Sequence, residues 1–289
     1  MYAAKAINTG VFDRFKSGTT PTQKASAAVR VKKQRALTQQ GLTAKEWSNK
    51  GASLYLLGRY EEAISCFDKA LEIDPRHVYA WDNKGASLND LGRHAEALQC
   101  FDKALEIDPR HVYAWDNKGA SLNDLGRHAE AINCYNKALE IDPRHVYAWY
   151  NKGASLNDLG RHAGAINCYN KALEIDPRLI VAWGNKGVSL HRLGRYAEAI
   201  RCYDKALEID PRYVNAWYNK GVSFHRLGRY AEAIECYDKA FEIDPRDIHV
   251  WYNKGVSLND LDHHQETIEC YDTALEIDPR HVNAQKAKE

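Results

Sequence analysis

A period of 34 residues constrains this sequence more than any other feature. Seven Trp recur at this interval from Trp47 to Trp251, and the seven Cys and seven of the eight Pro recur with the same step. A period of this length indicates stacked structural repeats, each of which contacts mainly its neighbours. The repeat overrides the usual expectation of two domains for a chain of 289 residues. We therefore expect one quasi-one-dimensional stack.

Each repeat predicts two helices and a stop. In residues 78–111, the apolar residues of segment 81–91 step by four, three and three, which places them on one helix face. Gly92 ends this helix because glycine accepts the left-handed backbone found at helix ends. A second helix is predicted over about 95–107, and Pro109 closes the repeat since proline cannot continue a helix.

The positions of the key residues then resemble a known family. With each repeat numbered from 1 to 34, Trp at 4, Gly at 8, Ala at 20, Phe or Tyr at 24, Ala at 27 and Pro at 32 form a pattern similar to the tetratricopeptide repeat (TPR). The resemblance implies an all-α, right-handed α-solenoid of seven antiparallel helix pairs. The seven expected units, repeats 1 to 7, fill residues 44–281 as 44–77, 78–111, 112–145, 146–179, 180–213, 214–247 and 248–281.

Lys at position 7 departs from the family pattern, which usually has an aliphatic residue there. A Lys stem can cover apolar surface while its ammonium reaches a carboxylate, so we expect each Lys to lie beside the Trp and point toward a neighbouring acid. The Cys residues are expected to be free, packed thiols. Equivalent positions in stacked helical repeats lie roughly 10 Å apart, and a disulfide needs Cα atoms within about 7 Å.

The last repeat is degenerate. Asp262 replaces the Gly at position 15, Thr267 replaces the Ala at position 20, and only a short polar tail, residues 282–289, follows. Gln285 stands where another Trp would fall. Terminal repeats of solenoids usually need a polar cap. We expect this end either to fray or to be covered by a partner or a second copy, which would allow self-association.

Residues 1–43 form a basic N-terminal arm. They hold eight basic residues and one acid, Asp13, a net charge of +7 against +1 for the whole chain. Such a segment fits a flexible or partner-ordered arm, with nucleic acid or an acidic protein as its partner. It also fits a helix over 26–40 that caps the first repeat, or an organelle transit peptide. No run of about 18 apolar residues indicates a membrane span, and we expect a cytoplasmic protein, or an organellar one if the arm is a transit peptide.

The resemblance implies a concave groove lined by positions 2, 5, 6, 9, 12 and 13 of each first helix. Position 6 is Asn in every repeat. A side-chain amide both donates and accepts, so a row of Asn could hold the backbone of an extended or helical segment without reading its side chains. The alternative is that each Asn bonds within its own hairpin. The expected asparagine ladder is Asn49, Asn83, Asn117, Asn151, Asn185, Asn219 and Asn253.

The other inward positions change along the chain. Repeats 2 to 4 have Tyr at position 2, Asn at 12 and Asp at 13, whereas repeats 5 and 6 have His at 12 and Arg at 13. We expect an acidic, Tyr-lined stretch beside a basic one, which would set the orientation of a ligand; the alternative is a solvated charge pattern. The residues are Tyr79, Tyr113, Tyr147, Asp90, Asp124, Asp158, His191, Arg192, His225 and Arg226.

Nothing indicates an enzyme. Every candidate acid, base or nucleophile recurs several times, whereas an active site needs one convergent set. We expect no metal site and no cofactor, because no ligand-type spacing occurs. The sequence predicts a non-catalytic protein–protein interaction scaffold that binds a protein segment in its groove. The alternative is an assembly factor docked by the arm on nucleic acid or a large complex, with the repeats as a spacer or oligomerisation module.

Overall fold

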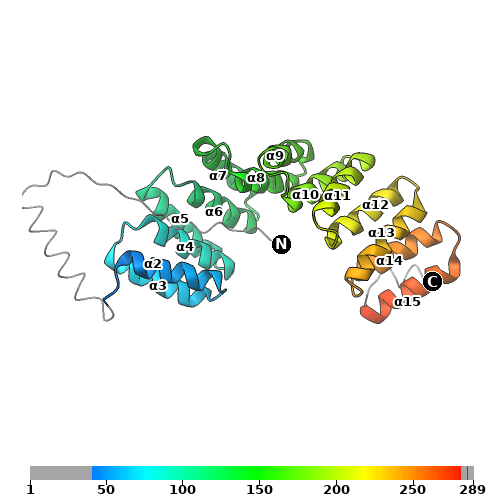
Figure 1. The fold of residues 1–289 in the computed structure, drawn as a ribbon, viewed down its shortest axis with the longest axis horizontal. Helices are drawn as coiled ribbons and strands as arrows, with labels where there is room; N and C mark the ends of the chain where they lie inside the picture. Colours follow the sequence, from blue (N-terminus) through cyan, green and yellow to red (C-terminus); the bar gives the residue numbers. More distant parts are fainter. Residues whose placement is uncertain (1–40, 281–284, 286–289) are drawn as a thin grey trace, which may run out of the picture. The chain divides into compact units, whose positions relative to one another are not determined.

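The computed structural model describes residues 41–280 and residue 285. This part of the chain forms fourteen α-helices and no β-strand (Figure 1). It divides into two compact units, an N-terminal unit that ends at Asn151 and a C-terminal unit that begins at Lys152. The predictions for the basic arm up to residue 40, and for all of the tail except Gln285, lie outside the described residues.

The helices come in consecutive antiparallel pairs, two to each 34-residue repeat, as predicted. The N-terminal unit holds α2 (Ala44–Leu56), α3 (Tyr60–Ile73), α4 (Val78–Asp90), α5 (His94–Ile107), α6 (Val112–Asp124) and α7 (His128–Ile141). The C-terminal unit holds α9 (His162–Ile175), α10 (Ile180–Arg192), α11 (Tyr196–Ile209), α12 (Val214–Arg226), α13 (Tyr230–Ile243), α14 (Ile248–Asn259) and α15 (His264–Ile277). Helix α8 (Val146–Asp158) contains the division between the units.

The helix ends follow from local chemistry. Thr43 and Glu46 form a capping box at the start of α2, in which the Thr43 hydroxyl accepts from the Glu46 N–H and the Glu46 carboxylate accepts from the Thr43 N–H. Glycine at position 15 follows each first helix through repeat 6 with a positive φ, +75° for Gly92. In repeat 7 this conformation falls on Asp262, with φ +60°, the one non-glycine residue in the described segments to adopt it.

Trp at position 4 joins successive repeats. The Trp81 indole N–H donates to the carbonyl of Pro75, 3.0 Å away, at the end of the preceding repeat, and the next five repeats reproduce this bond. At the C-terminal end the Gln285 amide donates to the carbonyl of Pro279 at 2.7 Å. Gln285 therefore makes the bond that Trp makes in the earlier repeats.

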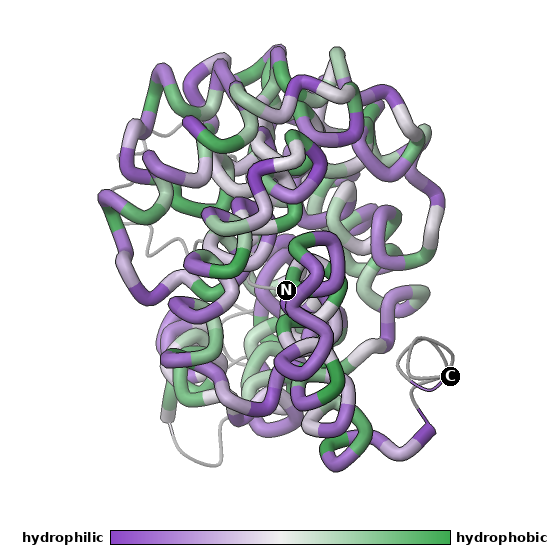
Figure 2. Tube along the Cα trace, turned by 90° about the vertical axis from the view of Figure 1, so that its right-hand side faces the viewer, coloured by the Kyte–Doolittle hydropathy of each residue, from purple (hydrophilic) through white to green (hydrophobic). Residues whose placement is uncertain are grey.

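Within each repeat the core closes around the glycine at position 8. A Cβ on Gly85 would lie 2.6 Å from Cε1 of Phe101, so only glycine lets the aromatic ring of the second helix approach this closely. Phe101, Ala97 and Ala104 are fully buried behind it. Figure 2 shows that hydrophobic and hydrophilic residues alternate along the helices, as expected when only one face of each helix is packed into the core. No helix in the described ranges is both long and apolar enough to cross a bilayer.

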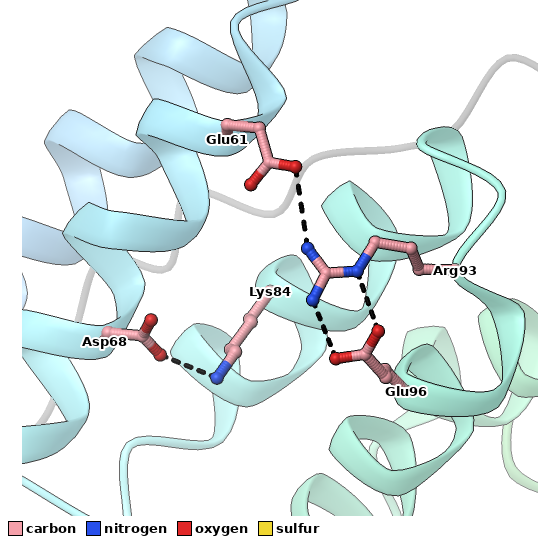
Figure 3. Close-up of polar contacts among 5 residues, drawn as sticks. All are labelled: Glu61, Asp68, Lys84, Arg93 and Glu96. Carbon is pink, nitrogen blue, oxygen red and sulfur yellow. Dashed lines mark hydrogen bonds and ion pairs between the residues drawn. The ribbon is translucent and has the colours of Figure 1, made fainter.

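The prediction for Cys is confirmed, and the prediction for Lys is confirmed in repeats 2, 3, 6 and 7 but not in repeat 5, where Lys186 lies beside Trp183 without a carboxylate partner in the described residues. Lys84 reaches Asp68 of the preceding repeat at 2.6 Å (Figure 3). Its ammonium lies 5.6 Å from the Trp81 ring centroid. Repeats 3, 6 and 7 have the same ion pair. All seven Cys are free and buried, and burial raises the pKa of the Cys100 thiol to about 11. These thiols are packing groups rather than nucleophiles.

Candidate functional site

The candidate binding residues lie on the first helices, and consecutive first helices contact each other directly within each unit, as α4 and α6 do. We call positions 2, 5, 6, 9, 12 and 13 of these helices the first-helix surface. Of the predicted site residues, Asn83 is buried, whereas Asn49, the Asp residues and the Arg residues are exposed. The half-buried ones are Asn117, Asn151, Asn185, Asn219, Asn253, Tyr79, Tyr113, Tyr147, His191 and His225.

In the N-terminal unit, the asparagine row is tied to carboxylates at position 5. Asn117 donates through Nδ2 to Asp82 of the preceding repeat at 3.0 Å, and Asn151 donates to Asp116 at 3.2 Å. His111 Nε2 also lies 3.1 Å from Asp82, in a pair whose side chains are only 7% and 5% exposed. In these two contacts the Asn side chains link neighbouring repeats rather than the helices of their own hairpins. Each amide still has a second donor hydrogen and an acceptor oxygen.

In the C-terminal unit, the same row takes a different set of partners. Position 5 is Gly184 in repeat 5 and Tyr218 in repeat 6, so no carboxylate is present there. Asn219 donates to the carbonyl of Asn215 in its own helix at 2.7 Å. Asn253 donates to the carbonyl of His249 at 2.8 Å and to the Tyr218 hydroxyl at 3.1 Å. Bonding within one hairpin therefore holds for Asn219 and in part for Asn253.

Position 12 is a coupling position rather than an open one. In repeat 2, the side-chain oxygen Oδ1 of Asn89 accepts a hydrogen bond from the Ser121 hydroxyl of the next repeat at 2.6 Å, and His94 Nδ1 lies 2.8 Å from the same oxygen. In repeat 5, His191 takes the place of Asn and lies 2.9 Å from the Ser223 hydroxyl, with its ring packed edge-on against Tyr196. His225 and Ser257 make the same contact one repeat further along the chain.

The basic residues predicted for repeats 5 and 6 are His at position 12 and Arg at position 13. Burial, and then the nearby Arg226 and Arg192, lower the pKa of His191. Burial is also the main cause that lowers the pKa of His225. Both imidazoles are therefore neutral at pH 7, and the positive charge of repeats 5 and 6 at these positions comes from Arg192 and Arg226.

The Asp residues at position 13 of repeats 2 to 4 are exposed, and two of them accept hydrogen bonds from neighbouring repeats. Asp90 accepts from the Tyr55 hydroxyl of the preceding repeat at 2.5 Å. Burial and this carboxylate raise the pKa of Tyr55. Asp124 lies 3.5 Å from the Asn89 amide nitrogen, the outer limit of a hydrogen bond. Tyr79 and Tyr113 pack edge-on against His111 and His145, with ring centroids 5.1 and 5.5 Å apart.

The row of Ser at position 10 was missed in the sequence. Ser87, Ser121, Ser189, Ser223 and Ser257 are fully buried, and they bond either to position 12 of the preceding repeat or to their own helix. The signal was available, because position 10 is Ser in all seven repeats. Within the described part of the chain, no group of three His, Cys, Asp or Glu residues is placed to hold a metal ion.

Sequence models of one known family match the same repeats that the helix pairs define. The sequence models of the tetratricopeptide repeat family match residues 77–144 and 178–246, and also 44–77, 146–179 and 249–281. The chain belongs to the tetratricopeptide repeat family. Proteins with this fold generally act as non-catalytic scaffolds that mediate protein–protein interactions. No curated protein sequence matches the chain.

Several solved structures are similar. YrrB, described as a TPR protein with an unusual peptide-binding site, is 25% identical with a TM-score of 0.56, over 66% of this chain and 98% of YrrB. MamA is also 25% identical with a TM-score of 0.54, over 59% of this chain and 97% of MamA. The C-terminal part of a TPR repeat-containing protein from Cytophaga hutchinsonii reaches a TM-score of 0.65 at 16% identity, over 83% of this chain and 99% of that one. This last likeness is one of fold alone.

Proposed function

We propose that this chain is a non-catalytic scaffold that holds a segment of another protein against the first-helix surface, with the Asn residues at position 6 contacting the backbone of that segment. The observation that carries the proposal is the presence of Asn at this position in all seven repeats. One identical amide in every repeat suits a ligand with a repeating backbone. The peptide-binding site described for YrrB supports this use of the fold.

The neighbouring residues favour ordered amides. A bond to the adjacent repeat holds Asn117 and Asn151, and bonds to backbone carbonyls hold Asn219 and Asn253. A restrained amide loses less conformational entropy when a ligand binds. The half-buried Tyr79 and Tyr113 offer aromatic contact area of the kind enriched at interfaces.

The two units are expected to prefer different segments. Asp90 and Asp124 favour a basic segment at the N-terminal unit, whereas Arg192 and Arg226 favour an acidic segment at the C-terminal unit. Such charges at the rim of an interface act mainly on orientation and association rate.

A selection from a random peptide display library against the full chain tests the proposal. The triple change Asn185→Ala, Asn219→Ala, Asn253→Ala is expected to weaken the selected peptides at least tenfold. The control is Lys137→Ala with Lys171→Ala, which removes exposed i,i+3 ion pairs from second helices and should leave affinity unchanged. Equal affinity for the wild type and the Asn variant would rule out the asparagine ladder.

The alternative, docking through the basic arm, gives a different result. The +7 charge of residues 1–43 is the observation that favours it. Binding by the arm would disappear when residues 1–40 are removed, would fall steeply with salt, and would not respond to the Asn changes. The same peptides and variants, measured at 50 and 300 mM salt, separate the two functions.

A further inference from the structure

A second recurring feature of the fold lies away from the asparagine row. Trp at position 4 and Lys at position 7 of a first helix, together with side chains of the second helix of the same repeat, line a pocket that we call the Trp–Lys pocket. In repeat 5, Ile166 and Asn170 of the preceding repeat line it as well. It occurs in repeats 2, 5 and 6, with volumes of about 500, 550 and 550 Å³. Three copies built on one pattern allow their charges to be compared directly.

In repeat 2 every charge of the pocket is matched. Lys84 pairs with Asp68 at 2.6 Å, and Arg93 lies between Glu96 at 2.7 Å and Glu61 at 3.5 Å (Figure 3). The remaining lining charges pair as Lys103 with Glu106 and Asp102 with Lys118. This copy offers no unbalanced group to a charged ligand.

In repeat 6 the pairing leaves one negative charge. Lys220 pairs with Asp204 at 2.7 Å, and Lys239 pairs with Glu242 at 2.8 Å. Asp238 and Glu232 are also paired, with Lys254 and Arg229. Among the described residues, Glu235 has no ion-pair partner, so this copy would repel an anion.

Repeat 5 has the opposite balance. Asn170 occupies position 25 of the preceding repeat, where repeats 2 and 6 find Asp68 and Asp204 as ion-pair partners of their pocket lysines. Lys186 therefore has no carboxylate partner within the described residues, and its ammonium rests 5.0 Å from the Trp183 ring centroid. Arg201, at the place of Gln99 in repeat 2, likewise forms no ion pair in this part of the chain.

The other charges of this pocket do not neutralise the two cations. Glu198 is held by Arg195 at 2.7 Å, and Glu208 is held by Lys205 at 2.7 Å. Asp204 is engaged by Lys220 of the next repeat. The hydrogen bond from Arg195 is the main cause that lowers the pKa of Glu198, and the charges of Arg201 and Lys186 lower it further. Four basic and three acidic side chains line this copy, so its lining has a net charge of +1.

The floor of the pocket is apolar. Ile166 and Leu190 are 8% and 2% exposed, and Trp183 is half-buried beside them. A pocket of this kind, with an apolar lining and a few polar groups, is typical of a ligand site. Arginine binds a carboxylate through two parallel N–H bonds, and lysine adds a point charge.

We propose that the Trp–Lys pocket of repeat 5 binds the carboxylate of a Glu or Asp side chain in an acidic segment of a partner protein. Arg201 and Lys186 hold the carboxylate, and the floor of Ile166, Leu190 and Trp183 takes an apolar neighbour of that residue. The site is separate from the first-helix surface, so it gives the scaffold a second contact with a partner.

Residues can be exchanged between the Trp–Lys pockets of repeats 2 and 5, so each substituted residue already occurs at the same position in another repeat. Asn170→Asp with Arg201→Gln gives the pocket of repeat 5 the residues of repeat 2 at these two positions, and Asp68→Asn with Gln99→Arg makes the reverse exchange. The probe is an array of dodecapeptides with two Glu residues at spacings of one to four in a Leu and Ala background, each beside a Gln counterpart. The best pairs are then measured in solution with the full chain.

For the wild type, we expect the best Glu peptide to bind at least tenfold more tightly than its Gln counterpart. Asn170→Asp with Arg201→Gln should remove that preference, while Lys137→Ala with Lys171→Ala, which removes exposed ion pairs elsewhere, should keep it. Asp68→Asn with Gln99→Arg should raise the stoichiometry from one peptide to two in calorimetry. The proposal is overturned by equal binding of Glu and Gln peptides, by a preference that survives the first variant, by loss in the lysine control, or by a stoichiometry that stays at one.

Discussion

Repeats 2 and 3 in the N-terminal unit and repeats 5 and 6 in the C-terminal unit have the same helices but different polar contacts between repeats. In the first pair, Asp82 accepts a hydrogen bond from Asn117 of the next repeat and contacts His111 at the end of its own repeat. In the second pair, position 5 has no carboxylate, and His191 contacts Ser223 across the repeats. The shared positions, Trp at 4, Gly at 8 and Pro at 32, therefore define the stack, and the variable positions decide how adjacent repeats are coupled.

The variable positions change in compensating pairs. Asn at position 12 occurs with His at position 17 in repeats 2 to 4, as in Asn89 and His94, and His at 12 occurs with Tyr at 17 in repeats 5 and 6. Both pairs satisfy the buried Ser of the next repeat. The change at position 12 thus preserves a structural contact, whereas the change at position 13 from Asp to Arg alters the charge offered to a ligand.

The largest expected effect is at the carboxylate that only the N-terminal pair has. Asp82→Ala leaves His111 and Asn117 without their buried acceptor, and breaking a buried pair of this kind costs about 3 kcal/mol. Amide hydrogen exchange should show faster opening of α4 and α6. The control is Asp124→Ala, which removes an exposed carboxylate from the same face and should change exchange little. Equal effects of the two changes would show that Asp82 does not couple the repeats.

A second pair of changes tests what the two units share. Ala in place of Gly119 or Gly187 puts a Cβ 2.5 or 2.4 Å from a buried tyrosine ring. Overpacking of this kind destabilises a protein by about 1–3 kcal/mol. The better helix propensity of Ala offsets up to ~1 kcal/mol of that loss. We expect a net loss of roughly 1–2 kcal/mol at both sites by denaturant unfolding. A large loss in one unit with none in the other would contradict a common core.

The fold was accessible from the sequence because its determinants recur at fixed steps. The spacing of Trp81, Gly85 and Leu88 predicted the first helix, and Gly92 predicted its end to within two residues. The partners of the candidate site were not accessible. Asn117 and Asp82 are 35 residues apart, and spacing within one helix does not say which side chain of the next repeat a given position meets. Asn89 was therefore assigned to the groove, although it is buried between repeats.

The compensating pairs can be tested by exchange. His191→Asn alone pairs an Asn with Tyr196, a combination absent from repeats 2 to 6, and leaves the ring contact unmade. We expect a loss of about 1 kcal/mol, since coupled neighbours show interaction energies of this order. The double change His191→Asn with Tyr196→His reproduces repeats 2 to 4 and should recover most of that loss. A double-mutant cycle measures the coupling, and additive effects would show that positions 12 and 17 vary independently.

Acidification should affect these same imidazoles. Because burial holds the pKa of His191 and His225 below the ordinary 6.5, the unfolded chain binds their protons first as pH falls. Their contribution is complete above pH 6.5 and is lost between that value and the lowered pKa. The denaturation midpoint should therefore fall between pH 7.5 and 5.5, and fall less in His191→Asn with His225→Asn. An identical pH dependence of the variant would exclude these two groups as the cause.

The smallest effect concerns the degenerate end of the C-terminal unit. Asp262 adopts the left-handed backbone that glycine adopts in the earlier repeats, and its N–H makes the same bond, to the carbonyl of Asn259 at 3.0 Å, that Gly228 makes to His225 at 2.9 Å. A non-glycine residue in this region costs about 1–2 kcal/mol, while glycine adds roughly 0.5–1 kcal/mol of chain entropy to the unfolded state. Asp262→Gly should therefore stabilise α14 and α15 by about 0.5–1 kcal/mol, and Gly228→Asp should destabilise α12 and α13 by a similar amount. Hydrogen exchange of these helices measures both changes. A loss of protection in Asp262→Gly would mean that the aspartate side chain stabilises the native state by more than its backbone strain destabilises it.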